Sequence, residues 1–402
     1  MLPASVAAAA GKRIAVALSG GVDSTVTALL LKQKGYNLLG VYMRNWDERD
    51  ESGHCHGDEE WNQVKSVCNR LDIDCVQVNF VREYWTNVFE QLLDGYRRGM
   101  TPNPDILCNR EIKFSALLNH CQEKLGAEYL ATGHYAQLRI DPDGDGKEVQ
   151  LLKGVDPSRD QTYFLASVRQ SALRRAMFPL GGMMKRSVFE LARAHGFEDI
   201  AALRESRGLC FIGKRKFAYF LSNYIEHKPG PVKLTCGKVI GEHPGVHTVT
   251  RGQQAILKYT NLSYQGTYFV NRRDPTTNTV HVVPDSRHPA LYSSDYVMSW
   301  PLWTASGMPA CLRDPHGVLS GLTLEPKMAP ENVTRNAAMR RFSHSHLAGN
   351  GSRHSDDVLV TCSHPIRGVA PGQFGVFYQG DVCIGCAQIR EALPMDEGDL
   401  TL

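Results

Sequence analysis

The sequence contains no uninterrupted apolar segment of about 20 residues, the length that a membrane-spanning helix requires. It also lacks a strong net charge, because 45 Lys and Arg residues against 42 Asp and Glu residues give a formal net charge of +3. A surface that binds nucleic acid must therefore be local rather than spread over the whole protein. The composition predicts no association with a membrane.

The first 22 residues contain no Asp or Glu, are rich in alanine and carry only two cations, Lys12 and Arg13. A presequence that directs a protein to an organelle usually carries more positive charge, and here a strand already begins at Ile14. The composition alone favours an irregular start to the chain over a signal peptide.

The 11 cysteines have no spacing typical of a disulfide framework, and their number is odd. In a chain of 402 residues this pattern favours a reducing environment, in which a few thiols take part in chemistry. The Walker motif is also missing, because no Gly-Lys-Ser or Gly-Lys-Thr follows the N-terminal glycine turn at the required spacing. No internal repeat is present, and the length indicates two or three domains.

The first half of the chain alternates strands with helices. After the strand that begins at Ile14, further strands are predicted over 37–43, 75–80 and 129–132, and helices over 25–34, 59–71 and 83–98. This alternation is typical of an α/β fold, a doubly wound parallel sheet with helices on both faces. Ligands of such sheets bind at the carboxyl ends of the strands.

The second half has a different texture. From about Pro229 glycine and proline become frequent, and alternating apolar runs at 266–270 and 279–283 predict strands. We expect three domains: an α/β domain over 1–225, a central β-rich domain over 226–286 and a C-terminal β-barrel over 287–402, with the joint near 285–289. The polar segment 344–357 is predicted to be a surface loop or insertion.

The first candidate site is the turn Ala-Leu-Ser-Gly-Gly-Val-Asp-Ser at 17–24, which follows the first strand. Such a turn leaves backbone N–H groups at a helix N-terminus, where they favour an anion such as pyrophosphate. Ser19 and Ser24 add hydroxyl donors, and the two glycines allow a phosphate to approach the backbone. An ordinary tight turn is the alternative. The string resembles the pyrophosphatase loop (PP-loop) of enzymes that cleave ATP between the α- and β-phosphates.

The second candidate site is the segment 99–114. Pro102 and Pro104 exclude a regular helix and predict a rigid loop, on which Asp105 and Cys108 follow. A helix is predicted to start near Arg110, so Cys108 would lie close to a helix N-terminus and to cations, which favour a nucleophilic thiolate. On spacing alone, a buried structural cysteine is an equal alternative.

The third candidate site is Cys210, which precedes Gly-Lys-Arg-Lys at 213–216 and would lie in a positive local field. Read alone, it could equally be a core residue beside Phe211 and Ile212. Cys108 and Cys210 are too far apart in the sequence for a CxxC pair but can meet in a fold.

Several segments occur in one order: the Ser-Gly-Gly-Val-Asp-Ser loop, 101–109, 131–135 (Ala-Thr-Gly-His-Tyr), 160–165 (Asp-Gln-Thr-Tyr-Phe-Leu), 210–213, 247–253 and 371–378. Together they resemble the tRNA-specific 2-thiouridylase family from residue 13 to about 389. The resemblance implies a PP-loop α/β domain of the adenine nucleotide alpha-hydrolase type. It implies a sulfurtransferase that adenylates the 2-oxygen of the wobble uridine and replaces it with sulfur, giving 2-thiouridine, AMP and pyrophosphate.

The resemblance also implies roles for individual residues. Cys210 carries a persulfide, Cys108 attacks or resolves it by forming a Cys108–Cys210 disulfide or releasing sulfide, and Asp105 acts as general acid/base. ATP, with Mg²⁺, is held by Ala17, Leu18, Ser19, Gly20, Gly21, Val22, Asp23, Ser24, Met43 and Gly133. No metal site of the protein itself and no permanently bound cofactor are expected.

For tRNA, the resemblance implies that Asn103, Pro104 and Asp105 contact the target base, which is flipped from the anticodon loop. Further tRNA contacts are implied for Arg159, Asp160, Gln161, Arg341 and Phe342. Basic clusters at 174–175, 185–186 and 214–216 could add phosphate contacts or be solvated helix faces. The chain departs from the family at Ser343 and at 383–386, which leaves the C-terminal tRNA contacts least supported.

The expected partners are tRNA and an upstream persulfide donor protein or cysteine desulfurase. The family implies a mitochondrial location for a eukaryotic member, with the cytoplasm as the alternative. Two other functions remain open: a PP-loop amide-forming ligase, which needs no paired cysteines, and a tRNA-binding module without catalysis. A four-cysteine iron–sulfur thiolase is disfavoured because no CxxC accompanies the loop.

Three other patterns are interpreted as structural. Cys383 and Cys386 lie in an alternating β pattern without the second pair that a structural zinc site needs. The His-Cys-His string at 54–56 is interpreted as a solvated loop. The tryptophans at 46, 61 and 85 are interpreted as core residues rather than base-stacking ones.

Overall fold

The computed structural model describes residues 11–46, 56–141, 148–203, 217–260, 262–305, 307, 318–326, 335–341, 357–393 and 395. A parallel sheet in the first half contains β1 (Arg13–Ala17), β2 (Asn37–Arg44), β3 (Asp74–Asn79), β4 (Tyr129–Ala131) and β7 (Ala176–Met177). The strand order is β3-β2-β1-β4-β7. In the central strand, Ile14 pairs with Leu38 on one side and with Tyr129 on the other.

Helices cover both faces of this sheet, because successive side chains of a strand point to opposite faces. Ile14 and Val16 pack toward α2 (Val22–Gln33), α3 (His56–Leu71), α10 (Lys185–Ala194) and α11 (Glu198–Ala201). Ala15 packs with the helical run on the opposite face, which comprises α4 (Val81–Tyr84), η1 (Trp85–Phe89), α5 (Glu90–Arg97), η2 (Cys108–Leu117) and α7 (Leu118–Lys124). The doubly wound α/β sheet predicted from the sequence is confirmed.

A hairpin links this domain to the C-terminal half of the chain. It consists of β5 (Ala136–Ile140) and β6 (Val149–Lys153), and β6 pairs with the last strand so that Leu152 lies opposite Val382. The short helices α8 (Thr162–Leu165), α9 (Gln170–Leu173) and α12 (Phe217–Leu221) follow in the chain. The hairpin therefore extends a sheet that belongs to a different part of the sequence.

The central region is a five-stranded sheet. It contains β8 (Gly230–Leu234), β9 (Val239–His243), β10 (Lys258–Tyr259), β11 (Phe269–Asp274) and β12 (Thr279–Val283), with the short helices η3 (Val246–Thr248) and η4 (Leu262–Tyr264). The strand predicted at 279–283 is β12. The strand predicted at 266–270 is shifted, because the N–H of Gly266 donates to the hydroxyl of Tyr259 and β11 begins only at Phe269.

The C-terminal region is a closed antiparallel barrel. After η5 (Pro289–Leu291), its strands are β13 (Tyr292–Met298), β15 (Val318–Pro326), β16 (Arg335–Arg341), β17 (Val358–Arg367), β18 (Phe374–Gln379) and β19 (Val382–Ala392), with β14 (Leu302–Trp303) paired to β19. Pairing of β13 with β19 closes the ring. The predicted C-terminal β-barrel is confirmed. Of the predicted loop at 344–357, only Asp357 is described, and it is buried.

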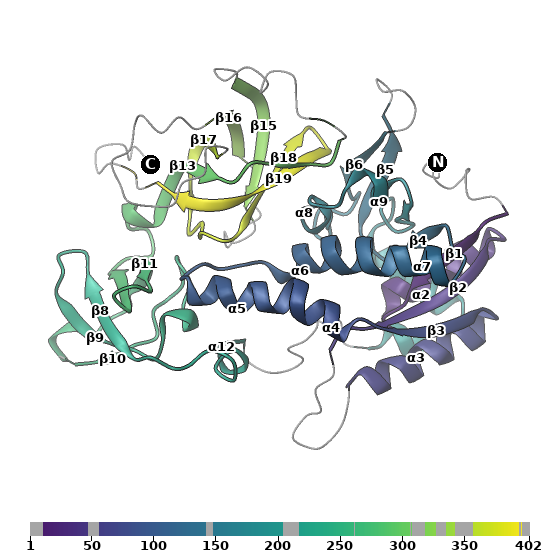
Figure 1. Cartoon of the computed structure of the whole chain (residues 1–402), viewed down its shortest axis with the longest axis horizontal. Helices are drawn as coiled ribbons and strands as arrows, with labels where there is room; N and C mark the ends of the chain where they lie inside the picture. Colours follow the sequence, from purple (N-terminus) through teal and green to yellow (C-terminus); the bar gives the residue numbers. More distant parts are fainter. Residues whose placement is uncertain are drawn as a thin grey trace.

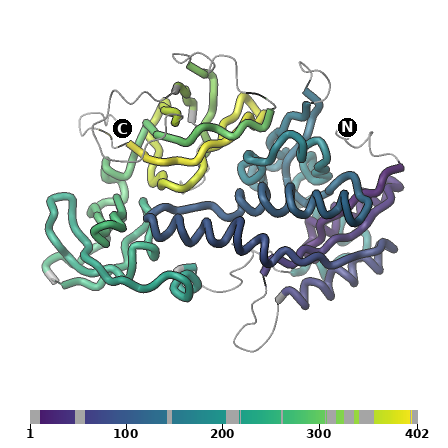
Figure 2. Tube along the Cα trace, viewed as in Figure 1, coloured from purple at the N-terminus to yellow at the C-terminus, as the bar shows by residue number. Residues whose placement is uncertain are grey.

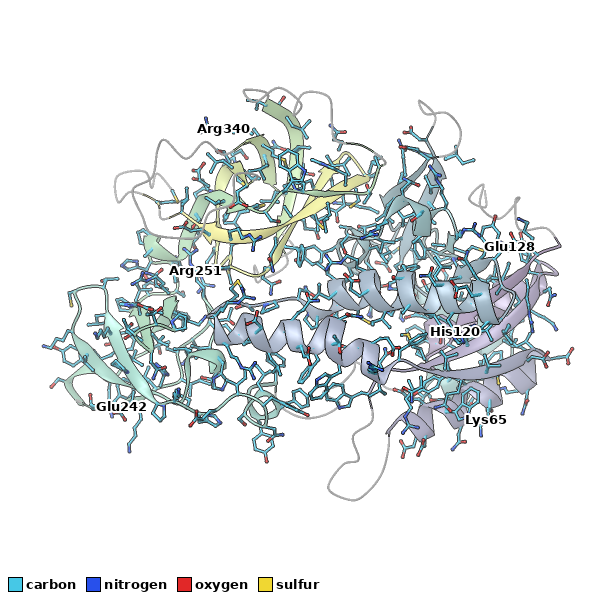
Figure 3. The ribbon with its side chains drawn as sticks, viewed as in Figure 1. Lys65, His120, Glu128, Glu242, Arg251 and Arg340 are labelled. Atoms are coloured by element: carbon cyan, nitrogen blue, oxygen red, sulfur yellow. The ribbon has the colours of Figure 1, made fainter. Side chains whose placement is uncertain are left out.

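The three parts meet around one helix (Figure 1). Helix α5 runs from the parallel sheet toward the central strands β8–β10, and the barrel lies along one side of it, as the trace in Figure 2 also shows. Arg251 joins two of the parts (Figure 3), because its guanidinium donates to the carbonyls of Val369 and Ala290. No helix of the described residues is long and apolar enough to cross a membrane.

Most of the cysteines and tryptophans that were interpreted as structural do pack inside the protein. Burial raises the pKa of Cys386 to about 12 and that of Cys383 well above its usual value, so both thiols are protonated. Trp46 stacks on Trp85 with 5.6 Å between ring centroids, although Trp85 is 37 % exposed. His54 and Cys55 lie outside the described residues.

Candidate functional site

The glycine turn lies at the carboxyl end of β1 and closes on itself. Gly20 has a φ of 79°, and α2 begins at Val22 rather than at the predicted Thr25. Ser24 is buried: its hydroxyl donates to the carbonyl of Gly21 (3.0 Å) and accepts from the N–H of Ser19 (3.2 Å). Ser24 thus holds the turn, whereas the side of the turn at Ser19 is exposed.

The turn also lies where the strand order of the sheet reverses. The chain passes from β1 to β2 on one side, while β4 flanks β1 on the other, and crevices at such points bind ligands in open α/β sheets. Met43 is near the end of β2. Gly133 follows β4, and a Cβ there would be 3.0 Å from the carbonyl carbon of Asp23. The structure therefore brings the predicted ATP-binding residues of three strands to one edge.

Asp23, in the first turn of α2, is held by two residues from distant segments. Lys185 Nζ lies 2.8 Å from each carboxylate oxygen, and the hydroxyl of Tyr135 donates to Oδ1 at 2.7 Å. The Lys185 side chain is only 10 % exposed and lies over the rings of Tyr135 and Phe189. In the sequence, Lys185 stands out only as part of the basic cluster at 185–186. The Ala-Thr-Gly-His-Tyr segment was the one signal that could have drawn attention to Tyr135.

His134, which directly precedes Tyr135 in the chain, is a neutral imidazole. Its Nδ1 lies 2.7 Å from the hydroxyl of Thr132, and its ring packs against Phe114 and Phe178. Desolvation by burial, with a smaller contribution from the charge of Lys113, holds the pKa of His134 well below its usual value.

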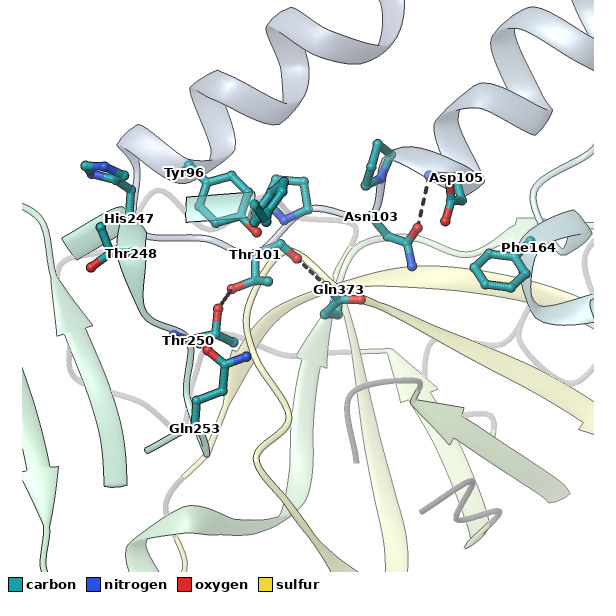
Figure 4. A pocket seen from close by; sticks show the side chains of 13 residues that line it. Tyr96, Thr101, Asn103, Asp105, Phe164, His247, Thr248, Thr250, Gln253 and Gln373 are labelled. Atoms are coloured by element: carbon teal, nitrogen blue, oxygen red, sulfur yellow. Dashed lines mark hydrogen bonds between the residues drawn. The ribbon is translucent and has the colours of Figure 1, made fainter. Parts of the chain in front are cut away.

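A cavity of about 330 Å³ lies where the three parts of the chain meet (Figure 4). Residues from all three parts form its wall: Tyr96, Thr101, Pro102, Asn103, Pro104, Asp105, Phe164, Phe217, His247, Thr248, Thr250, Gln253 and Gln373. This wall includes Asn103, Pro104 and Asp105, the three residues that the family resemblance implies contact the target base. Figure 4 shows Asp105 and Phe164 on the same side of this cavity.

The local structure around Asp105 differs from the predicted loop. Pro104 starts the short helix α6 (Pro104–Leu107). Proline is tolerated at the first helical position, because a backbone N–H there would have no acceptor within the helix. The side chain of Asn103 caps this helix by accepting from the N–H groups of Asp105 and Ile106. The helix predicted near Arg110 therefore begins earlier, and Cys108 lies inside the helical run rather than before it.

Cys108 is 5 % exposed and packs with Ile106, Leu107 and Ile112. Cys210 lies outside the described residues, as does the basic segment 214–216. Phe217, the first described residue after that segment, lines the same cavity as Asp105 and packs on Tyr96 with 5.4 Å between centroids.

A continuous set of contacts joins the turn to Cys108. The hydroxyl of Tyr135 bonds Asp23, and the main chain of Tyr135 exchanges hydrogen bonds with Gln161. Gln161 directly precedes α8, and the carbonyl of Phe164 in α8 accepts from Asn109, the neighbour of Cys108. The two candidate sites therefore belong to one packed unit.

The residues implied to contact tRNA fall into two groups. Asp160 accepts from the N–H of Gly154 and from the hydroxyl of Thr162, so it and Gln161 shape the turn before α8. Arg159 is half-buried in the same turn. Arg341 ends β16, and Phe342 lies outside the described residues.

Among the residues that the structure describes, no group of three or more His, Cys, Asp and Glu side chains is arranged to hold a metal ion.

Comparisons with known proteins extend over most of the chain. Family models match residues 12–214 ("tRNA methyl transferase HUP domain"), 218–284 ("tRNA methyl transferase PRC-barrel domain") and 327–389 ("Aminomethyltransferase beta-barrel domain"). Among solved structures, a U34-tRNA thiolase from Methanococcus maripaludis is 20% identical, covers 53% of this chain and 64% of its own, and has a TM-score of 0.32.

Curated relatives match almost end to end. The mitochondrial tRNA-specific 2-thiouridylase 1 of Drosophila melanogaster is 40% identical over 392 residues, which are 96% of this chain and 95% of the relative. The tRNA-specific 2-thiouridylase MnmA of Staphylococcus carnosus is also 40% identical over 392 residues, 97% of this chain and 98% of its own. The resemblance inferred from the motifs is confirmed, and the chain belongs to the tRNA-specific 2-thiouridylase family.

Proposed function

We propose that this protein is a tRNA-uridine 2-sulfurtransferase, which uses ATP to convert the wobble uridine of tRNA into 2-thiouridine. The observation that carries the proposal is the packed connection from Asp23 through Tyr135, Gln161 and Phe164 to the segment of Asp105 and Cys108. It links an anion-binding turn to a cavity that bears a carboxylate and has a thiol in the adjoining helix.

The first step activates the uridine. The N–H groups at the start of α2 and the exposed Ser19 side of the turn bind the phosphates, while Met43 and Gly133 line the nucleotide site. The 2-oxygen of the base attacks the α-phosphate, pyrophosphate leaves, and the adenylated oxygen becomes a good leaving group. Lys185 beside Asp23 supplies positive charge close to the phosphates.

The second step transfers sulfur. The outer sulfur of a persulfide on Cys210 attacks C2 of the base, and AMP departs with the former 2-oxygen. The thiolate of Cys108 then attacks the inner sulfur, which forms a Cys108–Cys210 disulfide and releases the thiolated base. Alternatively, Cys108 first attacks the persulfide and liberates sulfide as the nucleophile. In either route a cellular dithiol must reduce the disulfide before the next turnover.

The cavity accommodates the flipped base. Asp105 would exchange the proton of the base if it comes within hydrogen-bond distance. Phe164 offers a ring against which the base can stack, and such stacking is worth about 1–3 kcal/mol. Asn103 and Pro104 complete this wall. Arg159, Asp160, Gln161, Arg341 and Phe342 remain proposed tRNA contacts.

The proposal includes partners and a location. An upstream persulfide donor protein or a cysteine desulfurase reloads Cys210. The name of the Drosophila relative supports a mitochondrial location, with the cytoplasm as the alternative. The domain limits 1–225, 226–286 and 287–402 also remain proposals, which the three matched ranges support.

The test is a defined reaction. The protein is incubated with ATP, Mg²⁺, a persulfide donor and tRNA that has an unmodified wobble uridine, and the nucleosides are analysed by mass spectrometry. We expect 2-thiouridine together with AMP and pyrophosphate. ATP consumption without any 2-thiouridine would contradict sulfur transfer and favour the amide-forming ligase.

A further inference from the structure

Thr101 stands at the start of the segment that carries Asp105, and all its polar groups contact other parts of the chain. Its N–H donates to the carbonyl of Pro371 (2.7 Å), and its carbonyl accepts from Nε2 of Gln373 (2.6 Å). Its hydroxyl accepts from Nη2 of Arg273 at 2.6 Å and lies 3.3 Å from the hydroxyl of Thr250. Thr101 is itself 4 % exposed.

Arg273 contributes the central sheet to this contact. It lies on β11, and its guanidinium also donates through Nη1 to the carbonyl of Val249 at 2.8 Å. A buried guanidinium is costly unless its donors are satisfied, and its planar fork can bond two acceptors in fixed geometry. The fork therefore fixes the distance between Thr101 and the strand-like segment at Val249.

The barrel contributes Pro371, Gly372 and Gln373, which directly precede β18. Gly372 has a φ of 93°, and a Cβ there would lie 2.8 Å from the backbone nitrogen of Thr101. Only glycine lets the two main chains approach this closely. The side chain of Gln373 is 4 % exposed and makes its bond to Thr101 inside the protein, beside the cavity (Figure 4).

Pro102 and Pro104 make the segment after Thr101 stiff. Pro102 is fixed in turn, because its ring packs against Gly95 of α5, where no larger side chain would fit. A shift of Thr101 is therefore passed on to Asn103, the cap of α6, and to Asp105.

We propose that Arg273 is a positioning residue for the reaction, and that its bond to the hydroxyl of Thr101, which Gln373 holds from the barrel side, sets the place of Asp105 in the cavity. Neither Arg273 nor Gln373 needs to touch the substrate. The central sheet and the barrel thus influence the position of Asp105 through their bonds to Thr101, in addition to any contact that they make with tRNA. This inference rests on the proposed function for its assay.

The test compares matched pairs of variants. Thr101→Val removes the hydroxyl at constant shape, whereas Thr101→Ser keeps it. Arg273→Met removes the fork, and Arg272→Met on the same strand is the control, because Arg272 is exposed. We measure kcat for 2-thiouridine formation per folded molecule, KM for ATP, and the melting temperature.

We expect Thr101→Val and Arg273→Met to lower kcat on the order of 10²-fold, the size of effect that a misplaced reacting group produces, with KM for ATP unchanged. Thr101→Ser and Arg272→Met should retain the wild-type kcat. The double variant Thr101→Val/Arg273→Met should have the kcat of Arg273→Met, because the bond between the two side chains is already lost in that single variant.

The alternative is a purely structural role. It predicts lower melting temperatures with an unchanged kcat per folded molecule, and that result would overturn the inference. If Arg273→Met does not fold, the Thr101→Val and Thr101→Ser pair decides alone. A wild-type protein that makes no 2-thiouridine would contradict the proposed function, whereas active wild-type and equally active Thr101→Val would contradict only the positioning role.

Discussion

Lys185 and Asp23 form an ion pair with Nζ 2.8 Å from both carboxylate oxygens, although 162 residues separate them in the sequence. The pair ties the start of α10 to the first turn of α2. Because α2 begins directly after the glycine turn, the pair fixes the orientation of the N–H groups that are proposed to bind phosphate. The backbone N–H of Lys185 donates to Asp156, which anchors the lysine in turn.

Replacing this lysine tests its role in nucleotide binding. We expect Lys185→Met to weaken ATP binding roughly tenfold, or ~1.4 kcal/mol, because the turn loses a nearby cation and Asp23 loses its partner. Titration calorimetry with ATP measures the effect. Arg186→Met is the control, since the Arg186 side chain is 89% exposed and forms an ion pair with Glu190 on the same helix. Equal affinity of both variants would contradict the role of Lys185.

A substitution at Gly133 tests whether the contact between the loop after β4 and helix α2 supports ATP binding. In Gly133→Ala the new Cβ would lie 3.0 Å from the carbonyl carbon of Asp23, so one of the two segments must move. We expect ATP affinity to fall on the order of tenfold, again measured by calorimetry. Gly182→Ala is the matched change, because a Cβ at Gly182 meets no atom within 4 Å. If both glycine variants bind ATP like the wild type, Gly133 has no part in the nucleotide site.

The depressed pKa of His134 predicts a pH dependence of stability. Because its folded pKa lies well below the usual 6.5, the unfolded chain binds a proton between these two values that the folded protein does not. The free energy of unfolding should therefore fall as the pH drops below about 6.5, by up to ~1.4 kcal/mol per pH unit for this group. Urea unfolding of the wild type and of His134→Gln between about pH 7.5 and 5.5 measures the difference. The same slope in both proteins would contradict a desolvated, neutral His134.

Local patterns in the sequence were enough to predict the α/β sheet, the glycine turn and the barrel. The run from Ile14 to Ala17 and the run at 279–283 have the alternation or apolar character that their strands require. The order of short motifs also identified the family, because each motif is a contiguous string. These features depend on residues that are close together in the chain, so they can be recognised from the sequence alone.

Features that depend on distant partners could not be predicted. The pairing of Lys185 with Asp23 and the bond of Arg273 to Thr101 leave no periodic trace in the sequence. The two prolines at 102 and 104 predict a loop, but proline also fits the first helical position, and α6 begins at Pro104. The sequence predicts Ser24 as a hydroxyl donor of the turn, and in the structure this hydroxyl donates to the carbonyl of Gly21, a contact that the sequence does not reveal.

The central claim is that sulfur passes from Cys210 to the base with the help of Cys108. A single-turnover reaction tests it: the enzyme is loaded with a ³⁴S-labelled persulfide, freed of the donor, and mixed with ATP, Mg²⁺ and tRNA. Cys236→Ser, which changes an exposed free cysteine, is the control for Cys108→Ser and Cys210→Ser. The proposal predicts ³⁴S-labelled 2-thiouridine and a Cys108–Cys210 disulfide in the wild type and in Cys236→Ser, and no labelled product from either of the other variants. Labelled product at the wild-type rate from Cys210→Ser would contradict it.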